Sequence, residues 1–263
     1  MSKRITIQEL REVTQPISVR GRANSEHWVA DLYLRRISPY LTRILLRMNF
    51  TPNAVTWLMI LTGLAAALSL LIPGMLGVTL ALAFGQLQML WDCCDGEIAR
   101  WKQQYSPTGI FLDKVGHYLT EGSIALALGF RLADWPAQEI GNSSFPIVGA
   151  LFAAIVILNK ALNDAVHVSR YFAGLPKLED RKSASKSRIS SVNFVKSIFR
   201  FIPIHRMFHS VEMTIVIFLF SIVENLMGVQ ILENIFSWII PIASFVFIGH
   251  LISILTSEKL RVS

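Results

Sequence analysis

The sequence predicts an all-α polytopic membrane protein with six transmembrane helices and an N-terminal interfacial amphipathic helix. Three observations lead to this prediction. The 263 residues are 52% hydrophobic and only 16% charged, whereas a soluble domain carries about 25% charged residues. The apolar residues form long blocks, each close to the roughly 20 residues that a helix needs to cross a bilayer. The basic residues, which give a net charge of +7, lie between these blocks and favour a membrane protein over a nucleic-acid-binding one.

The first predicted element is an interfacial helix within a cytoplasmic N-terminal segment, residues 1–52. This segment begins with polar residues and has no apolar core of a signal peptide, so no cleavage is expected. Residues 27–48 combine apolar residues at helical spacing with intervening arginines. Such a helix would lie with its apolar face toward the acyl chains and its arginines near anionic headgroups. A helix that binds a partner protein is the alternative.

Six spans are predicted within residues 53–256. They cover residues 53–72, 75–100, 107–132, 145–171, 210–229 and 234–256. Two of the blocks carry ionisable residues inside the span, away from its ends, namely Asp113, His117 and Glu121 in the third, and Lys160 and Asp164 in the fourth. Because ionisable groups are costly in lipid, these two helices are not expected to face lipid on all sides.

Lys and Arg are concentrated at one end of this arrangement. With six spans, both termini and the second-to-third and fourth-to-fifth connections share one side, and most basic residues outside the spans fall there. Since positive residues flank spans on the cytoplasmic side, we expect both termini to be cytoplasmic, including a tail of residues 257–263. The acidic end of the second span would open to the same side. The cell (plasma) membrane is the expected location.

Acidic residues mark the junction of the second and third spans. Asp92 and Asp95 are three residues apart and would share one helix face, which Gly96 continues without a side chain. Asp113 lies early in the next helix. Carboxylates at a bilayer edge require neutralisation, and oxygen-rich sites suit Mg²⁺, Mn²⁺ or Ca²⁺. Together with the positive charge of Arg100, the cluster predicts a metal site that could hold a diphosphate.

These residues resemble the signature of the CDP-alcohol phosphotransferase (CDP-alcohol phosphatidyltransferase) family. The matching positions are Asp92-x2-Asp95-Gly96-x2-Ala99-Arg100-x8-Gly109-x3-Asp113. The family signature ends in one more aspartate, four residues later, where this chain has His117. The Thr51-Pro52-Asn53 sequence before the first span, the interfacial helix and the six spans also look like that family, so the resemblance covers most of the chain.

The resemblance implies transfer of a phosphoalcohol from a CDP-linked donor to an acceptor hydroxyl, with release of CMP, in phospholipid biosynthesis. It further implies a homodimer that depends on Mg²⁺ or Mn²⁺. CDP-diacylglycerol is the expected donor because the site lies at headgroup depth, and the acceptor is a polar alcohol that the sequence leaves open. Membrane lipids are expected partners and nucleic acid is not. The residues that the resemblance assigns are the metal ligands Asp92, Asp95 and Asp113, and the cytidine-diphosphate pocket residues Asp95, Gly96, Ala99, Arg100 and Gly109.

His117 takes the position of an aspartate that, in the family, helps to hold metal and is the proposed base for the acceptor hydroxyl. With Asp113 it forms the expected catalytic pair. Neutral imidazole binds Mn²⁺ and suits a general base, but it is a poorer Mg²⁺ ligand than a carboxylate. We expect His117 to act as a base, or to bind a second metal that is weaker or different. Two alternatives stay open, namely that Glu121 supplies the missing carboxylate, or that the chain is an inactive CDP-lipid-binding relative.

The other polar residues of the spans receive structural interpretations. Lys160 and Asp164, four residues apart, are expected to pair with each other, with the lining of a polar cavity as the alternative. Four basic residues are expected to face headgroups, or alternatively to bind an acceptor phosphate: Arg170, Arg181, Lys182 and Arg188. The histidines and cysteines outside the site are taken as structural, namely His209, His250, Cys93 and Cys94, and no role is assigned to Glu212 or Glu224.

A transporter that uses the acidic residues as an ion path is the rival from another class. It is disfavoured because Asp92, Asp95 and Asp113 cluster at one membrane face rather than crossing it. No inverted repeat, which is typical of many transporters, is evident in the sequence.

Overall fold

The computed structural model describes residues 5–16, 19, 30–176 and 208–260, and within these ranges the chain is helical without strands. Five described helices are long and apolar enough to cross a membrane: α4 (Pro52–Ser69), α5 (Gly74–Lys102), α7 (Phe145–Phe172), α9 (Ser210–Met227) and α11 (Ile239–Thr256). The predicted third span is the 26-residue helix α6 (Pro107–Leu132), which packs against α4 and α7 but contains Asp113, Lys114 and Glu121. The all-α polytopic membrane fold is thereby confirmed.

The helices around the acidic residues begin at side-chain caps. The Thr51 hydroxyl accepts the Ala54 backbone N–H at 3.2 Å, and the Ser106 hydroxyl accepts the Gly109 N–H at 2.9 Å. A proline follows each cap as the first helical residue, where its missing N–H costs nothing. These caps fix where α4 and α6 start relative to the end of α5.

The prediction of one continuous helix for the last span, residues 234–256, is wrong. The structure has a short helix α10 (Ile231–Ser237) and then α11, with the break at Trp238. Pro241 has no N–H to donate to the carbonyl of Ser237, four residues earlier, and this missing bond explains the break.

The N-terminal segment packs against the end of α5. It comprises α1 (Ile7–Thr14), the π-helical turn η1 (Ala30–Leu34) and α3 (Arg35–Arg47). The start of the predicted interfacial helix, residues 27–29, lies outside the described residues. The face of α3 toward α5 is mixed, because Ser38 and Thr42 are polar whereas Leu45 packs in an apolar cluster with residues of α5, and Ile37 and Ile44 are exposed. The apolar face available to a membrane surface is therefore the one turned away from α5.

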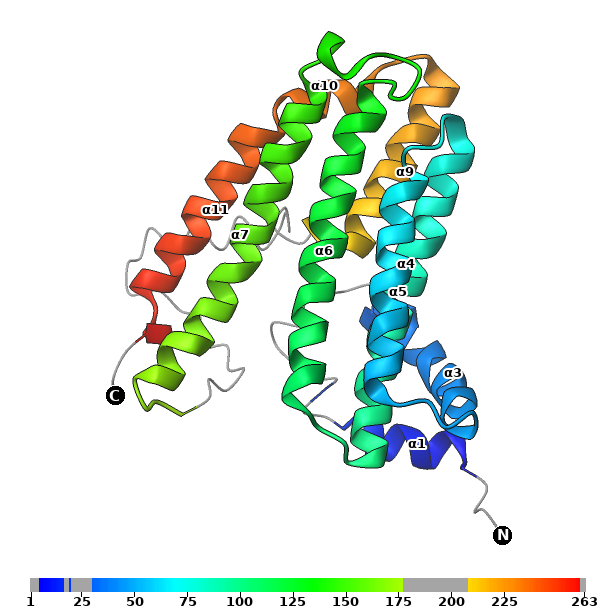
Figure 1. Ribbon diagram of the computed structural model, residues 1–263, viewed down its shortest axis with the longest axis vertical. Helices are drawn as coiled ribbons and strands as arrows, with labels where there is room; N and C mark the ends of the chain where they lie inside the picture. The colour runs from blue at the N-terminus through cyan, green and yellow to red at the C-terminus, as the bar shows by residue number, and fades with distance from the viewer. Residues whose placement is uncertain (1–4, 17–18, 20–29, 177–207, 261–263) are drawn as a thin grey trace.

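The helices α4, α5 and α6 form a closely packed group, and α7 diverges from it (Figure 1). A Cβ at Gly63 of α4 would lie 2.0 Å from the Thr120 hydroxyl of α6, so only glycine permits this approach. At the end of α6, a Cβ at Gly129 would lie 2.4 Å from the carbonyl of Phe145 in α7. The two helices are thus in contact at one end and separate toward the other.

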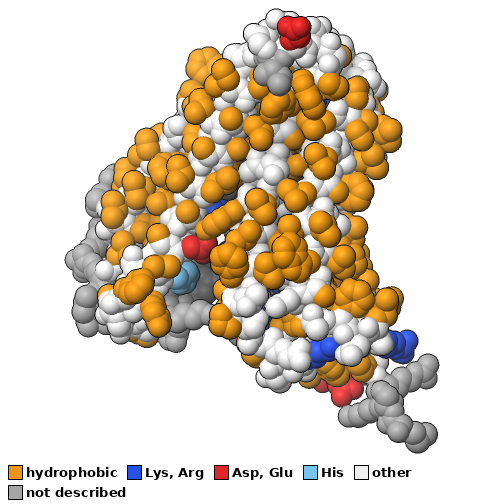
Figure 2. All heavy atoms as spheres, in the orientation of Figure 1, with side chains coloured by type: hydrophobic (Ala, Val, Ile, Leu, Met, Phe, Trp, Pro, Cys, Tyr) orange, Lys and Arg blue, Asp and Glu red, His pale blue; other side chains and the backbone are white. Residues whose placement is uncertain are grey.

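The separation of α6 and α7 leaves a hollow. Figure 2 shows hydrophobic side chains over most of the visible face, with acidic, basic and histidine side chains in the hollow between α7 and α6. The apolar core includes Phe152 of α7, whose ring contacts the rings of Phe208 and of Phe236 in α10, the helix at the top of Figure 1. Polar groups are therefore gathered at the end of the bundle where α6 begins.

The first and last described elements, α1 and η5 (Glu258–Leu260), lie toward this same end, opposite α10 (Figure 1). At the opposite end the Arg131 guanidinium joins the end of α6 to the α4–α5 turn. It donates to the carbonyls of Leu70, Ile72 and Gly74 at 3.1, 2.8 and 2.9 Å. A chain with an even number of spans begins and ends on the same side, so the shared end of α1 and η5 agrees with the six-span prediction.

Candidate metal and donor site

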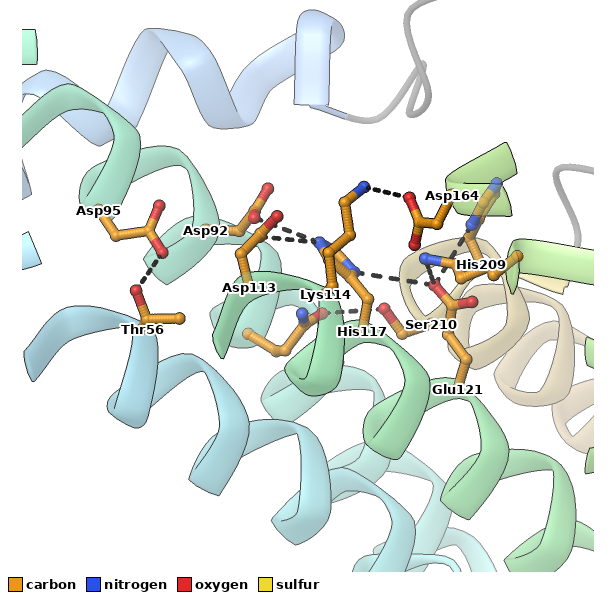
Figure 3. Close-up of polar contacts among 12 residues, drawn as sticks. Thr56, Asp92, Asp95, Asp113, Lys114, His117, Glu121, Asp164, His209 and Ser210 are labelled. Atoms are coloured by element: carbon orange, nitrogen blue, oxygen red, sulfur yellow. Dashed lines mark hydrogen bonds and ion pairs between the residues drawn. The ribbon is translucent and has the colours of Figure 1, made fainter. Parts of the chain in front are cut away.

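Three of the four predicted metal ligands converge between α5 and α6. Ligand atoms of Asp92, Asp113 and His117 all lie within 4.8 Å of one another. His117 Nε2 is 3.3 Å from Asp92 Oδ1 and 3.5 Å from Asp113 Oδ1 (Figure 3). The histidine is buried, whereas the Asp113 side chain is 35% exposed and the Asp92 side chain 24%. The ligand set therefore has a buried imidazole and two carboxylates that can be reached from outside.

Asp95, the fourth predicted ligand, is turned toward α4. Its Oδ2 accepts a hydrogen bond from the Thr56 hydroxyl at 2.7 Å (Figure 3). Thr56 lies one turn into α4 and also bonds the Pro52 carbonyl at 3.1 Å. Asp95 thus lies beside the cluster, one turn closer to the end of α5. Its carboxylate is not among the ligand atoms that lie within 4.8 Å of one another.

The predicted pocket residues lie around the end of α5. Gly96 has the Arg100 guanidinium along its open face, because a Cβ there would be 3.1 Å from Arg100 Nη1. The Arg100 Nε donates to the Thr14 carbonyl of α1 at 2.5 Å. A Cβ at Gly109 would be 2.9 Å from Asn53 Oδ1, and Ala99 is half-buried. Gly96, Ala99 and Gly109 are thus small residues at close contacts, and Arg100 places a positive charge near the end of α5.

Glu121 belongs to a second cluster behind His117 and not to the metal ligand group. Its Oε1 lies 2.6 Å from Lys160 Nζ, 3.3 Å from His209 Nδ1 and 3.9 Å from His117 Nδ1 (Figure 3). The Glu121 side chain is only 1% exposed. The lysine neutralises a carboxylate that would otherwise be costly at this depth. His209, interpreted from the sequence as structural, contacts this carboxylate.

The predicted pairing of Lys160 with Asp164 is wrong. Lys160 pairs with Glu121, and Asp164 instead lies 3.2 Å from Lys114 Nζ and accepts a hydrogen bond from the Tyr118 hydroxyl. All three partners of this pair come from α6, which faces α7 across the hollow. The ion pairs therefore join α7 to α6 and do not link Lys160 to Asp164 along α7.

Glu97 is a buried carboxylate near the site whose role the sequence did not reveal. It is completely buried on α5, and its carboxylate accepts hydrogen bonds from Gln15 at 2.7 Å, from Thr42 at 2.6 Å and from Ser38. Ser38 and Thr42 are four residues apart on α3, and this spacing is the sequence feature that could have indicated a polar face turned toward a buried partner. The carboxylate holds the N-terminal helices against the end of α5 that carries the acidic cluster.

The remaining assigned residues have ordinary structural surroundings. Glu224 accepts the Leu232 backbone N–H at 2.6 Å, and His250 Nδ1 lies 2.8 Å from Asn159 Oδ1. Glu212 is buried at the start of α9, and Cys93 and Cys94 are buried free thiols. Arg170 donates to the carbonyls of Pro176 and Lys259, and Arg181, Lys182 and Arg188 lie outside the described residues.

A polytopic helical bundle with two carboxylates and an imidazole converging at one end defines a membrane protein with a candidate divalent-metal site. Sequence comparison then specifies the family, because residues 49–199 match the CDP-alcohol phosphatidyltransferase family. The match covers more than half of the chain and all signature residues, so the protein belongs to this family. No curated protein matches the sequence. Family membership makes the protein a transferase of phospholipid synthesis that uses a divalent metal, a CDP-alcohol donor and an alcohol acceptor.

Proposed function

We propose that this protein is a Mg²⁺- or Mn²⁺-dependent phosphotransferase that moves the phosphatidyl group of CDP-diacylglycerol to a polar alcohol and releases CMP. The observation that supports it best is the convergence of Asp92, Asp113 and His117 within 4.8 Å. Two carboxylates and one imidazole fit Mn²⁺ well, whereas Mg²⁺ prefers oxygen ligands throughout. The donor set therefore suits a divalent metal and favours Mn²⁺ over Mg²⁺.

The cation would be held by Asp92, Asp113 and the Nε2 of His117, with Asp95 beside them. When bound, it would neutralise the donor diphosphate and the charge that develops on the departing CMP. Arg100 would add a positive charge from the end of α5. Gly96, Ala99 and Gly109 would shape the nucleotide pocket, since their small side chains let the Arg100 guanidinium lie over Gly96 and Asn53 of α4 lie close to Gly109.

Proton transfer is assigned to Asp113 rather than to His117. Nε2 of His117 has a single lone pair, which cannot bind a cation and accept a proton at once. Asp113 is the most exposed of the three ligands and has a second carboxylate oxygen. In the proposed step, the acceptor oxygen bonds to the diacylglycerol-bearing phosphorus, the bond from that phosphorus to the CMP oxygen breaks, and the acceptor proton passes to Asp113.

The test is CMP release by the purified protein in lipid nanodiscs with CDP-diacylglycerol, Mn²⁺ or Mg²⁺ and a panel of polar alcohols. We expect release that requires both a metal and one of the alcohols. Asp113→Asn should reduce it by at least about 100-fold, the lower range for loss of a general base. Nucleotide binding without turnover in the unmodified protein would instead support the inactive CDP-lipid-binding relative.

The proposed site faces the cytoplasm, in a protein of the plasma membrane that acts as a homodimer. Its N-terminal segment, residues 1–52, would lie on the membrane surface, residues 53–256 would form the six-span transferase domain, and residues 257–263 a cytoplasmic tail. The positive residues at the end of α5, Arg100 and Lys102, support this orientation.

A further inference from the structure

The column of polar residues on α6 continues beyond the proposed metal ligands. Asp113, His117 and Glu121 are spaced four residues apart and therefore lie on one helix face, one turn after another. His117 is the middle member, so its ring lies between two acidic groups. Its Nε2 faces Asp92 and Asp113 at 3.3 and 3.5 Å, and its Nδ1 faces Glu121 at 3.9 Å.

The two ring nitrogens cannot have the same role once a cation is present. A cation between Asp92 and Asp113 requires the lone pair of Nε2, so a neutral ring must carry its proton on Nδ1. An N–H at that position belongs to a buried side chain and needs an acceptor. Metal-binding histidines generally donate their second N–H to a carboxylate or carbonyl, which fixes the ring and makes it a better ligand.

Glu121 has the properties of that acceptor. It is fixed by Lys160 at 2.6 Å and His209 at 3.3 Å, both through Oε1. Its other oxygen, Oε2, is buried and has no hydrogen-bond partner among the residues that the structure describes. One oxygen is thus committed to holding the side chain in place, while the carboxylate keeps unused capacity to accept a hydrogen bond. The 3.9 Å separation between Glu121 Oε1 and His117 Nδ1 is longer than a direct hydrogen bond, and a small rotation of the ring or carboxylate would close it.

We propose that Glu121, held by Lys160 and His209, is a positioning residue that orients His117 so that its Nε2 lone pair faces the cation held by Asp92 and Asp113. Glu121 does not touch the cation or the substrate in this role. The inference rests on the proposed metal site and adds the reason why a histidine can stand at this position. An aspartate there would need no orienting acceptor, because either of its oxygens can bind a cation.

The inference is tested by Mn²⁺ binding to the purified full-length protein in nanodiscs, measured as loss of the free Mn²⁺ signal in electron paramagnetic resonance. We expect Glu121→Gln to weaken Mn²⁺ binding by about tenfold, the lower end for loss of such an acceptor. The amide keeps the shape of the side chain but can donate as well as accept, and so no longer selects one orientation of the ring. Glu224→Gln, the same exchange at the far end of α9, should leave Mn²⁺ affinity unchanged.

A double-mutant cycle separates positioning from general structural damage. In a His117→Asp background there is no ring to orient, so Glu121→Gln should change Mn²⁺ affinity by less than about twofold. An equal loss in both backgrounds, or no loss in the unmodified background, would overturn the inference. If the unmodified protein binds no Mn²⁺, the proposed function fails instead, so the two failures are distinct.

The removal of one buried charge also needs a folding control. Glu121→Gln leaves Lys160 without its partner, so the Lys160→Gln, Glu121→Gln double variant is measured in parallel, because its two amides can bond to each other. Thermal unfolding in detergent identifies which variants are folded. The inference requires that the double variant, when folded, also binds Mn²⁺ about tenfold more weakly, and normal affinity in it would count against a role for Glu121.

Discussion

The exchange of a carboxylate for an imidazole at residue 117 changes which cation the site should favour. His117 provides one nitrogen lone pair to a site that otherwise contains carboxylates. Nitrogen ligands suit Mn²⁺ better than Mg²⁺. His117→Asp is therefore expected to raise the ratio of Mg²⁺-supported to Mn²⁺-supported CMP release by about tenfold, or ~1.4 kcal/mol. The two initial rates, measured at equal metal concentrations well below saturation, check this, and an unchanged ratio would remove His117 from the metal site.

Glu97 gives a second prediction at the level of one residue, this time on stability. Glu97→Ala removes the acceptor of three hydrogen bonds, from Gln15, Ser38 and Thr42, in a fully buried place. Buried donors left without an acceptor cost about 1–3 kcal/mol each. We expect a loss of about 3 kcal/mol in the free energy of unfolding, measured by denaturant titration in detergent. Glu139→Ala, an exposed carboxylate at the opposite end, is the control and should cost little.

Single residues also show where reasoning from the sequence ends. The signature spacing was sufficient to bring Asp92, Asp113 and His117 together, because helix periodicity and one short turn determine their faces. The partners of Lys160 and Asp164 were not predictable in the same way. Both residues could pair along α7, and only the angle at which α6 meets α7 makes Glu121 and Lys114 the nearer partners. Tertiary geometry of this kind leaves no periodic pattern in one sequence.

At the level of elements, the contact between α6 and α7 sets the width of the hollow in which the Glu121 cluster lies. Gly129 permits the close approach, since a Cβ would lie 2.4 Å from a backbone carbonyl that cannot move independently. Gly129→Val is expected to cost about 2 kcal/mol of stability through this clash. Gly249 in α11 serves as the control, because a Cβ there would meet no atom within 4 Å, and Gly249→Ala should be neutral or slightly stabilising. The prediction is checked by the melting temperatures of both variants, measured by thermal unfolding in the same detergent.

Element boundaries followed from local chemistry wherever a cap was present. The predicted third span starts at the same residue as α6, Pro107, and the predicted first span, from residue 53, starts within one residue of α4. The N-terminal helix α1 was missed because its eight residues are too short for a clear apolar period. It is held in place largely by tertiary bonds, such as those from Gln15 to Glu97 and from Arg100 to Thr14.

At the level of the whole molecule, the bundle has two chemically different ends. One end carries the acidic cluster, α1 and η5, and the other carries α10 and the α6–α7 connection (Figure 1). Charge also divides them, with Arg100 and Lys102 closing α5 at the first end. In the proposed reaction, this division would keep the lipid donor in the bilayer while a polar alcohol enters from the end that carries the acidic cluster.

The direction of insertion can be measured with single cysteines. The native Cys93 and Cys94 are buried and free, so they should react slowly with a membrane-impermeant maleimide. Gln104→Cys, in the exposed turn between α5 and α6, is expected to react only after the cytoplasmic side is opened, because the positive end of the bundle stays inside. Asn142→Cys, exposed at the opposite end, should react on intact cells. The reverse labelling pattern would place the acidic cluster outside the cell, away from cytoplasmic CDP-linked donors, and would contradict both the orientation and the proposed reaction.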